Sequence, residues 1–125
     1  MASSVRTVTF DTRDPYHLAG FWLQVFEVER PDDDEPGDPY AAVVTDTVKL
    51  LFAQNSDHKV TKNRVHLDLE PTQPRDAEVD RIVALGATIA YDHRKPDGAG
   101  FVVLQDPEGN EFCVLRSAAE RAATS

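Results

Sequence analysis

The sequence has a single cysteine among its 125 residues, so no disulfide can form within the chain and the fold needs no oxidising compartment. It lacks any run of about 18 consecutive apolar residues, which excludes a membrane-spanning helix. Its first residues, MASSVRTVTF, contain no apolar stretch of signal-peptide length. We therefore expect a cytoplasmic protein that forms a single domain over 1–125, long enough to bury roughly two-thirds of its unfolded surface.

Basic residues are also scarce. The chain has 13 Lys and Arg against 22 Asp and Glu, which gives a net charge of -9. Such a surface repels polyanions, and the few basic side chains are scattered along the sequence. We therefore expect no nucleic-acid partner and no membrane partner, which leaves a small molecule or a second copy of the chain.

The first half of the sequence alternates between strand and helix patterns. Val5–Thr12 has the apolar period of two that is typical of a half-buried strand. Asp14 and Pro15 then predict a helix start, and an apolar stripe at helical spacing follows. This stripe comprises Leu18, Phe21, Trp22, Val25 and Phe26. Further strands are predicted near Glu27–Arg30, Tyr40–Thr47 and Val48–Gln54, and the acidic, proline-rich segment 31–40 is predicted to be a loop.

The second half has the same order of patterns. Arg64–Glu70 alternates as a strand, and Gln73–Pro74 opens a helix that Gly86 is placed to end. Val79, Ile82 and Val83 form the apolar stripe of this helix. The remaining strands are predicted near Thr88–His93, Gly100–Gln105 and Glu111–Arg116. The tail, 117–125, is too short to be a stable helix on its own.

The sequence patterns of the two halves align when the first half is shifted by 59 residues, which places Thr7 at His66 and Pro15 at Pro74. Each half therefore reads as strand, helix and three strands. We expect two βαβββ modules, the first over about 4–56 and the second over about 62–117, within an α+β fold.

This duplication is accompanied by three sequence words, KNRVHLDL (62–69), EVDRIVALGA (78–87) and DPEGNEFCVLR (106–116). Together they resemble a glyoxalase-like domain of the vicinal oxygen chelate superfamily, which includes glyoxalase I, extradiol dioxygenases, fosfomycin-resistance transferases and bleomycin-binding proteins. The resemblance runs from about Val5 to about Arg116. It implies two modules whose strands curl into a cup-shaped mixed sheet, with helices on the convex side and the ligand on the concave side, and it implies a homodimer.

Strand alternation then assigns side chains to the two faces of the sheet. On the closing strand, Phe112 and Val114 suit the helix side, which leaves Glu111, Cys113 and Leu115 facing the cup. On each opening strand the polar set faces the cup. The predicted ligand-binding residues are therefore Thr7, Thr9, His66, Asp68, Cys113 and Leu115.

The resemblance also implies where a divalent cation would be held, namely by histidines on the first strand of each module and carboxylates on the last. His66 matches the second histidine, whereas the first falls on Thr7 and the closing carboxylate falls on Cys113. The fourth position lies on Val48–Gln54, where Leu51, Ala53 and Gln54 are the candidates. Because one good ligand out of four cannot hold an ion, we expect no metal and no other cofactor. A His–Cys pair that recruits zinc or copper stays open as an alternative.

Two residues of this set have both an ordinary and a functional interpretation. Cys113 can be a small apolar residue lining the cup, since no Lys or Arg neighbours it on its face to favour a thiolate. His66 is the candidate catalytic residue, as a hydrogen-bond donor or general acid/base. Asp68 lies two residues away on the same strand, a separation of about 7 Å that predicts no direct bond without a water. For His93 we expect ordinary solvent exposure, and Arg94 and Lys95 could meet an anionic ligand.

The sequence thus favours a metal-free binding protein that sequesters a small, partly aromatic or amphipathic compound in the cup. The alternative is a divergent lyase or dioxygenase-type enzyme that uses His66 as acid/base or as a metal ligand. A third possibility is a module that serves chiefly for dimerisation. The sequence does not decide whether any reaction is catalysed.

Overall fold

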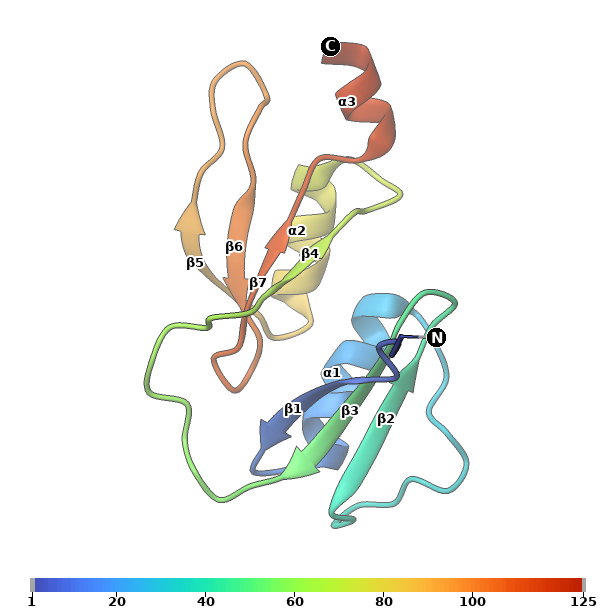
Figure 1. Cartoon of the computed structure of the whole chain (residues 1–125). Coiled ribbons are helices and arrows are strands. Elements are labelled where there is room, and N and C mark those ends of the chain that lie inside the picture. Colours follow the sequence, from blue (N-terminus) through green and yellow to red (C-terminus); the bar gives the residue numbers. More distant parts are fainter. Residues whose placement is uncertain (1, 125) are drawn as a thin grey trace. The chain divides into compact units, whose positions relative to one another are not determined.

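The computed structural model describes residues 2–124, which divide into two compact units. Unit 1 covers Met1–His58 and unit 2 covers Lys59–Ser125. The elements of unit 1 are β1 (Val8–Thr12), α1 (Pro15–Phe26), β2 (Tyr40–Val44) and β3 (Lys49–Gln54) (Figure 1). The elements of unit 2 are β4 (Leu67–Leu69), α2 (Arg75–Ala84), β5 (Thr88–Asp92), β6 (Val102–Gln105), β7 (Glu111–Val114) and α3 (Ala118–Thr124). Within residues 2–124, no helix has the length and apolar character needed to cross a bilayer.

Unit 1 is a three-stranded sheet covered on one face by α1 (Figure 1). Its central strand, β3, is parallel to β1 and antiparallel to β2. The helix begins as predicted: the Asp14 carboxylate accepts a hydrogen bond from the backbone N–H of His17 at 3.2 Å, and Pro15 occupies the first turn. The cap fixes the start of α1 at Pro15, just before the first residues of the apolar stripe.

The core of unit 1 is aromatic. The ring of Trp22, which is fully buried, lies edge-on to Phe10 at 5.9 Å and is stacked with Phe26 at 5.8 Å. Phe10 in turn contacts Phe52 of β3 at 5.3 Å. The predicted helical stripe therefore packs on the apolar face of the predicted strand, and Trp22 and Phe52 are among the largest fully buried side chains.

The strand predicted near Glu27–Arg30 is absent from unit 1 as described. Glu27 ends α1 in the left-handed conformation, with φ of 56°, which turns the chain away from an extended path. The guanidinium of Arg30 then lies 3.6 Å from the centroid of the Tyr16 ring and donates to the Tyr16 carbonyl oxygen at 3.2 Å. The segment is thus held against α1 by side-chain contacts and has no strand partner.

Unit 2 repeats the topology of unit 1 with one more strand. β4 is parallel to β7, β7 is antiparallel to β6, and β5 forms the far edge next to β6. Val79 and Ile82 of α2 are buried with Phe112 and Val114 of β7, whereas Val83 is exposed and the prediction for it was wrong. Gly86 follows the helix with a positive φ, as expected.

The loop between β5 and β6 is a long hairpin that the buried side chain of Arg75 holds in place. Its guanidinium donates to the carbonyl oxygens of Gly98, Ala99 and Gly100 at 2.9–3.2 Å. Gly100 has φ of +95°, and a Cβ there would lie 2.0 Å from the carbonyl oxygen of His93, so only glycine allows this close approach. The two sides of the hairpin are thereby fixed at a defined spacing.

The tail forms the short helix α3, which is stabilised by contact with α2. The carboxylate of Glu120 accepts hydrogen bonds from the backbone N–H groups of Arg75, at 2.7 Å, and Ser117, at 2.9 Å. One side chain thus satisfies free donors at the starts of both helices, which explains how a segment too short to be helical alone is ordered here.

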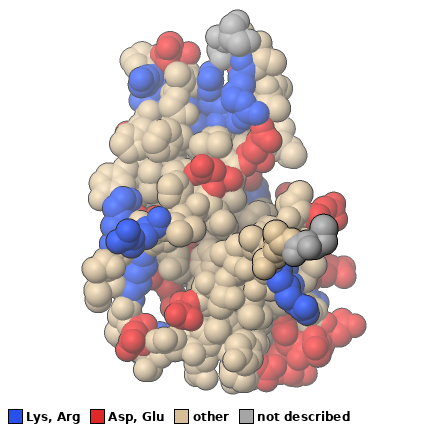
Figure 2. All heavy atoms as spheres, in the orientation of Figure 1, with Lys and Arg blue, Asp and Glu red and all other residues tan. Residues whose placement is uncertain are grey.

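The α+β class with mixed sheets is confirmed. The loop predicted over 31–40 contains no helix or strand up to residue 39, whereas Tyr40 already begins β2. The Asp34 carboxylate ties the loop to β2 by accepting a hydrogen bond from the N–H of Ala42 at 2.9 Å. Figure 2 shows acidic side chains in excess on the visible face, with basic side chains in separate small groups. The cup formed by both modules, and the module bounds 4–56 and 62–117, stay predictions.

Candidate functional site

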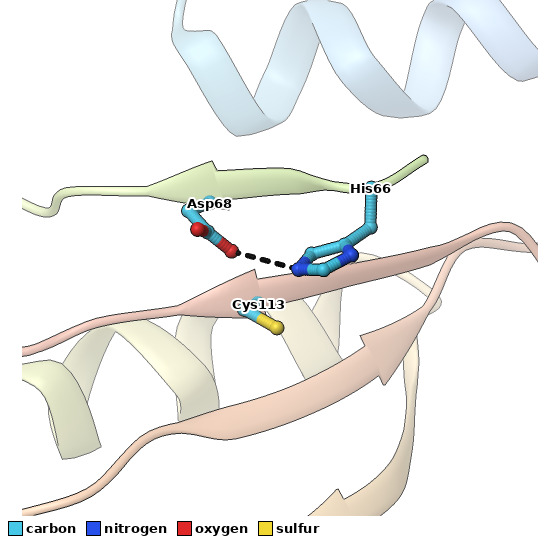
Figure 3. A group of neighbouring side chains, drawn as sticks. All are labelled: His66, Asp68 and Cys113. Atoms are coloured by element: carbon cyan, nitrogen blue, oxygen red, sulfur yellow. Dashed lines mark ion pairs between the residues drawn. The ribbon is translucent and has the colours of Figure 1, made fainter. Parts of the chain in front are cut away.

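The parallel pair of β4 and β7 brings three polar side chains together in unit 2. In this pair Asp68 lies opposite Cys113, between the pairs Leu67–Phe112 and Leu69–Val114. Phe112 and Val114 are buried on the α2 side, so alternation turns Cys113 to the other face of the sheet. Figure 3 shows the imidazole of His66 and the carboxylate of Asp68 directed from β4 toward the thiol on β7.

The distances within this group are short. Nε2 of His66 lies 3.2 Å from Oδ1 of Asp68. The prediction that these side chains are too far apart for direct contact was wrong. It rested on the backbone spacing of a regular strand, whereas His66 precedes β4 and the two side chains lean toward each other. We call His66, Asp68 and Cys113 the donor trio, because one ligand atom from each lies within 4.8 Å of the others.

The electrostatics of the trio keep the thiol protonated. Cys113 is 5% exposed, and this burial raises its pKa to about 11, with smaller contributions from the negative charge of Asp68 and from a hydrogen bond to that carboxylate. Asp68 therefore contacts both an imidazole and a thiol. Because His66 contacts the carboxylate and does not activate the sulfur, the trio is not arranged as a cysteine nucleophile with its base.

His66 and Cys113 also line a pocket of about 410 Å³. The remaining lining residues are Lys62, Asn63, Tyr91, His93, Phe101, Val103 and Glu111. The rings of Tyr91 and His93 are stacked at 6.3 Å, and His93 is 4.8 Å from Phe101. The exposed lining is predominantly apolar, so the pocket has an aromatic wall with a few polar groups at its edge.

Sequence reasoning missed this aromatic wall. Tyr91 and His93 are two residues apart at the end of β5, and the hairpin returns Phe101 beside them. The same alternation that was applied to β4 and β7 would have placed Tyr91 and His93 on one face. Arg94, which we considered for an anionic ligand, is instead bonded to Asp92 at 2.6 Å and to Asp76 at 3.3 Å.

A buried carboxylate forms another wall of the pocket. Glu111 is 6% exposed and accepts hydrogen bonds from the backbone N–H of Asn63 at 2.9 Å and from Nζ of Lys62 at 3.1 Å. The Asn63 N–H is the main cause that lowers the pKa of Glu111, and Lys62 lowers it further. Glu111 thereby fastens the segment before β4 to the first residue of β7.

The other predicted ligand-binding residues are not among the lining residues described for this pocket. Leu115 follows β7 and pairs through its N–H with the carbonyl of Leu69 at 2.9 Å, and it is not among the described lining of the pocket. Thr9 is on β1 and Thr7 precedes it, both in unit 1. Thr7 lines a separate pocket of about 320 Å³ there. That all six residues share one cup stays a prediction.

The donors of unit 2 can be compared with the metal ligands that the resemblance implies. In unit 1 the residue opposite Thr9 is Leu51, which has no donor atom, and Thr7 offers only a hydroxyl. The donor trio supplies an imidazole, a carboxylate and a thiol. A set that contains sulfur suits zinc, whereas a hard cation such as Mn²⁺ prefers oxygen ligands, so these residues do not fit a manganese centre and do fit a softer ion.

Comparisons with known proteins agree with the fold described above. The glyoxalase-like domain family matches residues 7–115. A glyoxalase/bleomycin resistance protein/dioxygenase family enzyme from Burkholderia phytofirmans PsJN is 21% identical, with TM-score 0.70 over 90% of this chain and 97% of that one. A mutant of the fosfomycin resistance protein FosX from Listeria monocytogenes, complexed with Mn(II) and 1S,2S-dihydroxypropylphosphonic acid, is 17% identical, with TM-score 0.70 over 97% and 95%.

A lactoylglutathione lyase from Agrobacterium tumefaciens is 19% identical, with TM-score 0.62 over 90% of this chain and 92% of that one. Among curated proteins, none matches this sequence. The likeness to solved structures shows the fold, and the family match covers most of the chain. The chain belongs to the glyoxalase-like domain family, and it shares its fold with a solved member of the glyoxalase/bleomycin resistance protein/dioxygenase family.

Proposed function

We propose that this chain binds a small organic molecule with a flat apolar part in the pocket of unit 2, and that protein side chains hold it without need of a metal ion. The observation that carries the proposal is the row of rings formed by Tyr91, His93 and Phe101 along the wall of that pocket. Binding by this site would make the chain a sequestering protein.

The pocket has the size and composition of a small-molecule site. Its volume of about 410 Å³ falls in the range of about 300–1,000 Å³ that is usual for ligand pockets. Tyr91 is 53% exposed and Phe101 is 38% exposed, so a ligand that stacks on them removes apolar surface from water. Stacking on an aromatic face contributes about 0.5–1.5 kcal/mol beyond that burial.

A few polar groups can orient the ligand. The imidazole of His66 and the ammonium of Lys62 lie at the pocket, and Nζ of Lys62 is 5.6 Å from the centroid of the Tyr91 ring. A molecule with an aromatic body and one hydrogen-bonding substituent matches this arrangement. None of these contacts requires an ion, which distinguishes the proposal from the Mn(II) complex of the Listeria neighbour.

The test is a binding screen with flat aromatic fragments, scored by the shift in melting temperature and then by calorimetry. Tyr91→Ala should weaken the best fragment by about tenfold, which corresponds to about 1.4 kcal/mol. Tyr40→Ala is the matched control, since Tyr40 is a similarly exposed tyrosine in unit 1, and it should leave the affinity unchanged. Equal effects of the two substitutions, or no fragment bound by the native chain, would contradict the proposal.

A second candidate function is an enzyme of the same superfamily, of lyase or dioxygenase type, with His66 as general acid or base. The contact of 3.2 Å between His66 and Asp68 favours it, because a carboxylate orients an imidazole and fixes its tautomer. Once a ligand is found, mass spectrometry would detect its conversion. His66→Gln should then abolish conversion while leaving the melting temperature unchanged. A ligand that is bound and recovered intact would exclude turnover of that compound.

The homodimer and the cytoplasmic location expected from the sequence remain part of this proposal. Support for the dimer comes from the family resemblance. Light scattering coupled to size exclusion would measure the mass directly, and a mass equal to one chain at micromolar concentration would contradict it.

A further inference from the structure

The donor trio gathers three different metal-binding groups around one point at the edge of the pocket. The imidazole and the carboxylate come from neighbouring positions at the start of unit 2, and the thiol comes from the strand paired with them. Figure 3 shows the side chains of His66 and Asp68 directed toward the side of the sheet where the thiol of Cys113 lies. We propose that His66, Asp68 and Cys113 bind one Zn²⁺ ion, with the fourth coordination position directed to the pocket.

The geometry requires little rearrangement. Zinc bonds of about 2.0–2.3 Å in tetrahedral arrangement place neighbouring donor atoms about 3.3–3.8 Å apart. Nε2 of His66 and Oδ1 of Asp68 are already 3.2 Å apart, and no pair in the trio exceeds 4.8 Å. Side-chain rotations of about 1 Å therefore complete the site without a change in strand register.

The chemistry selects a thiophilic cation. The ion would replace the proton of the Cys113 thiol, which passes to water as an S–Zn bond forms. His66 would present Nε2 without its proton, which moves to Nδ1 in the other neutral tautomer. Asp68 contributes one carboxylate oxygen. Thiolate and imidazole favour zinc over Mn²⁺, which prefers oxygen donors and a higher coordination number.

Two of these ligands, His66 and Cys113, stand at positions that the family pattern implies, and the set departs from that pattern by taking every donor from one unit. That pattern uses donors from both modules, and in unit 1 the corresponding residues, Thr7 and Leu51, cannot replace them. The third ligand here is Asp68, which we had judged too far from His66. The inference thus revises the expectation that the chain holds no metal.

The site and the proposed binding function can be separated. His66 and Cys113 line the pocket, so an ion held by them would leave its open position facing any ligand there. The aromatic wall does not depend on the ion. Chelator-treated protein should therefore still bind the aromatic fragment, and a failure of either proposal leaves the other standing.

Titration of the chelator-treated full chain with Zn²⁺ by calorimetry tests the proposal, with Mn²⁺ as the comparison ion. We expect one Zn²⁺ per chain and binding at least about 100-fold weaker for Mn²⁺. Asp68→Asn and His66→Gln should each weaken zinc binding by about 100-fold or more. Asp80→Asn, an exposed acid-to-amide change on α2, is the matched control and should have no effect.

Substitution by Co²⁺ gives a second readout. Coordination by Cys113 should produce a thiolate-to-cobalt charge-transfer band that Cys113→Ser abolishes, and circular dichroism would check that this variant is folded. The absence of saturable one-to-one binding would overturn the proposal. So would an unaltered affinity in Asp68→Asn, or a cobalt spectrum that persists in Cys113→Ser.

Discussion

The two units share a scaffold and differ in the side chains placed on it. In unit 1, β1 and β3 form a parallel pair in which Thr9 lies opposite Leu51. In unit 2, β4 and β7 form the equivalent pair, in which Asp68 lies opposite Cys113. The shift of 59 residues that aligns the halves lays Thr9 on Asp68, and each of these residues pairs with the parallel strand of its own unit, so the two pairs correspond in the sheets. Only the second pair, among the described residues, belongs to a group that could hold a metal.

The units also differ in the use of some aromatic residues. Trp22 and Phe52 of unit 1 are buried between helix and sheet, whereas Tyr91 and Phe101 of unit 2 are exposed at the pocket. The buried rings of unit 1 contribute to its stability. Unit 2 leaves apolar surface in contact with water, which costs stability and is typical of a binding site.

The largest expected effect comes from removing a ring from the core of unit 1. Trp22→Ala should lower the free energy of unfolding by about 3–5 kcal/mol, because it leaves a cavity among Phe10, Phe21 and Phe26. The matched change in unit 2, Phe101→Ala, should cost less than about 1 kcal/mol, since that ring is partly exposed. Urea denaturation would measure both, and similar losses would refute the division of roles.

The second effect concerns the reactivity of the thiol. With a pKa of about 11, Cys113 has about a thousandth of its population as thiolate at pH 8, against about a tenth for the usual value of 9.0. Alkylation by iodoacetamide should therefore be about 100-fold slower than for an unstructured peptide. Leu51→Cys in a Cys113→Ala background places a thiol opposite Thr9 instead of Asp68, and it should react faster. Equal rates at the two positions would show that Asp68 and burial have no such influence.

The third effect tests how the pocket wall of unit 2 is held. Arg75→Met should lower stability by about 2 kcal/mol, because the carbonyl oxygens of residues 98–100 lose a charged donor. The hairpin amides, such as the N–H of Lys95 that bonds to Ala99, should exchange hydrogen faster. Arg64→Met, at an exposed arginine, is the control. If the hairpin amides exchange at the native rate in Arg75→Met, the hairpin is stable without the Arg75 side chain.

The same comparison shows how far the sequence could be interpreted. Helix starts and strand faces follow from local chemistry, as the Asp14 cap and the burial of Phe112 and Val114 illustrate, and these were predicted correctly. The missing strand of unit 1 depends on the left-handed backbone of Glu27, which an alternation pattern does not encode. The contact of Arg30 with Tyr16 depends on the turn at Glu27, so the sequence pattern did not predict that contact either.

Within the site, the sheet face of each side chain was easier to predict than the contacts between side chains. The sequence places His66, Asp68 and Cys113 near one another through strand parity, yet the contact between His66 and Asp68 depends on side-chain rotation near the end of a strand. The aromatic wall depends on the hairpin geometry that Gly100 and Arg75 impose. Such long-range placement has no local signal in the sequence.

The smallest expected effect comes from a comparison of the first residues of β3 and β7. Glu111 of β7 corresponds to Lys49 of β3, and it holds Asn63 and Lys62 through its buried carboxylate. Glu111→Gln should cost about 1 kcal/mol at pH 7, since it removes a charge from these hydrogen bonds. Lys49→Gln, at the corresponding position of unit 1, should cost less.

The contribution of Glu111 to the free energy of unfolding should depend on pH in a definite direction. The pKa of Glu111 in the folded chain is lowered, so its contribution is complete above the usual glutamate pKa of about 4.5 and is lost as the pH falls through the lowered folded value. The native chain and Glu111→Gln should therefore differ most near neutral pH and converge in acid, as measured by urea midpoints across pH. A difference that stays constant down to strongly acidic pH would mean that the carboxylate charge does not fasten the pocket wall, and that Asn63 is held by neutral contacts alone.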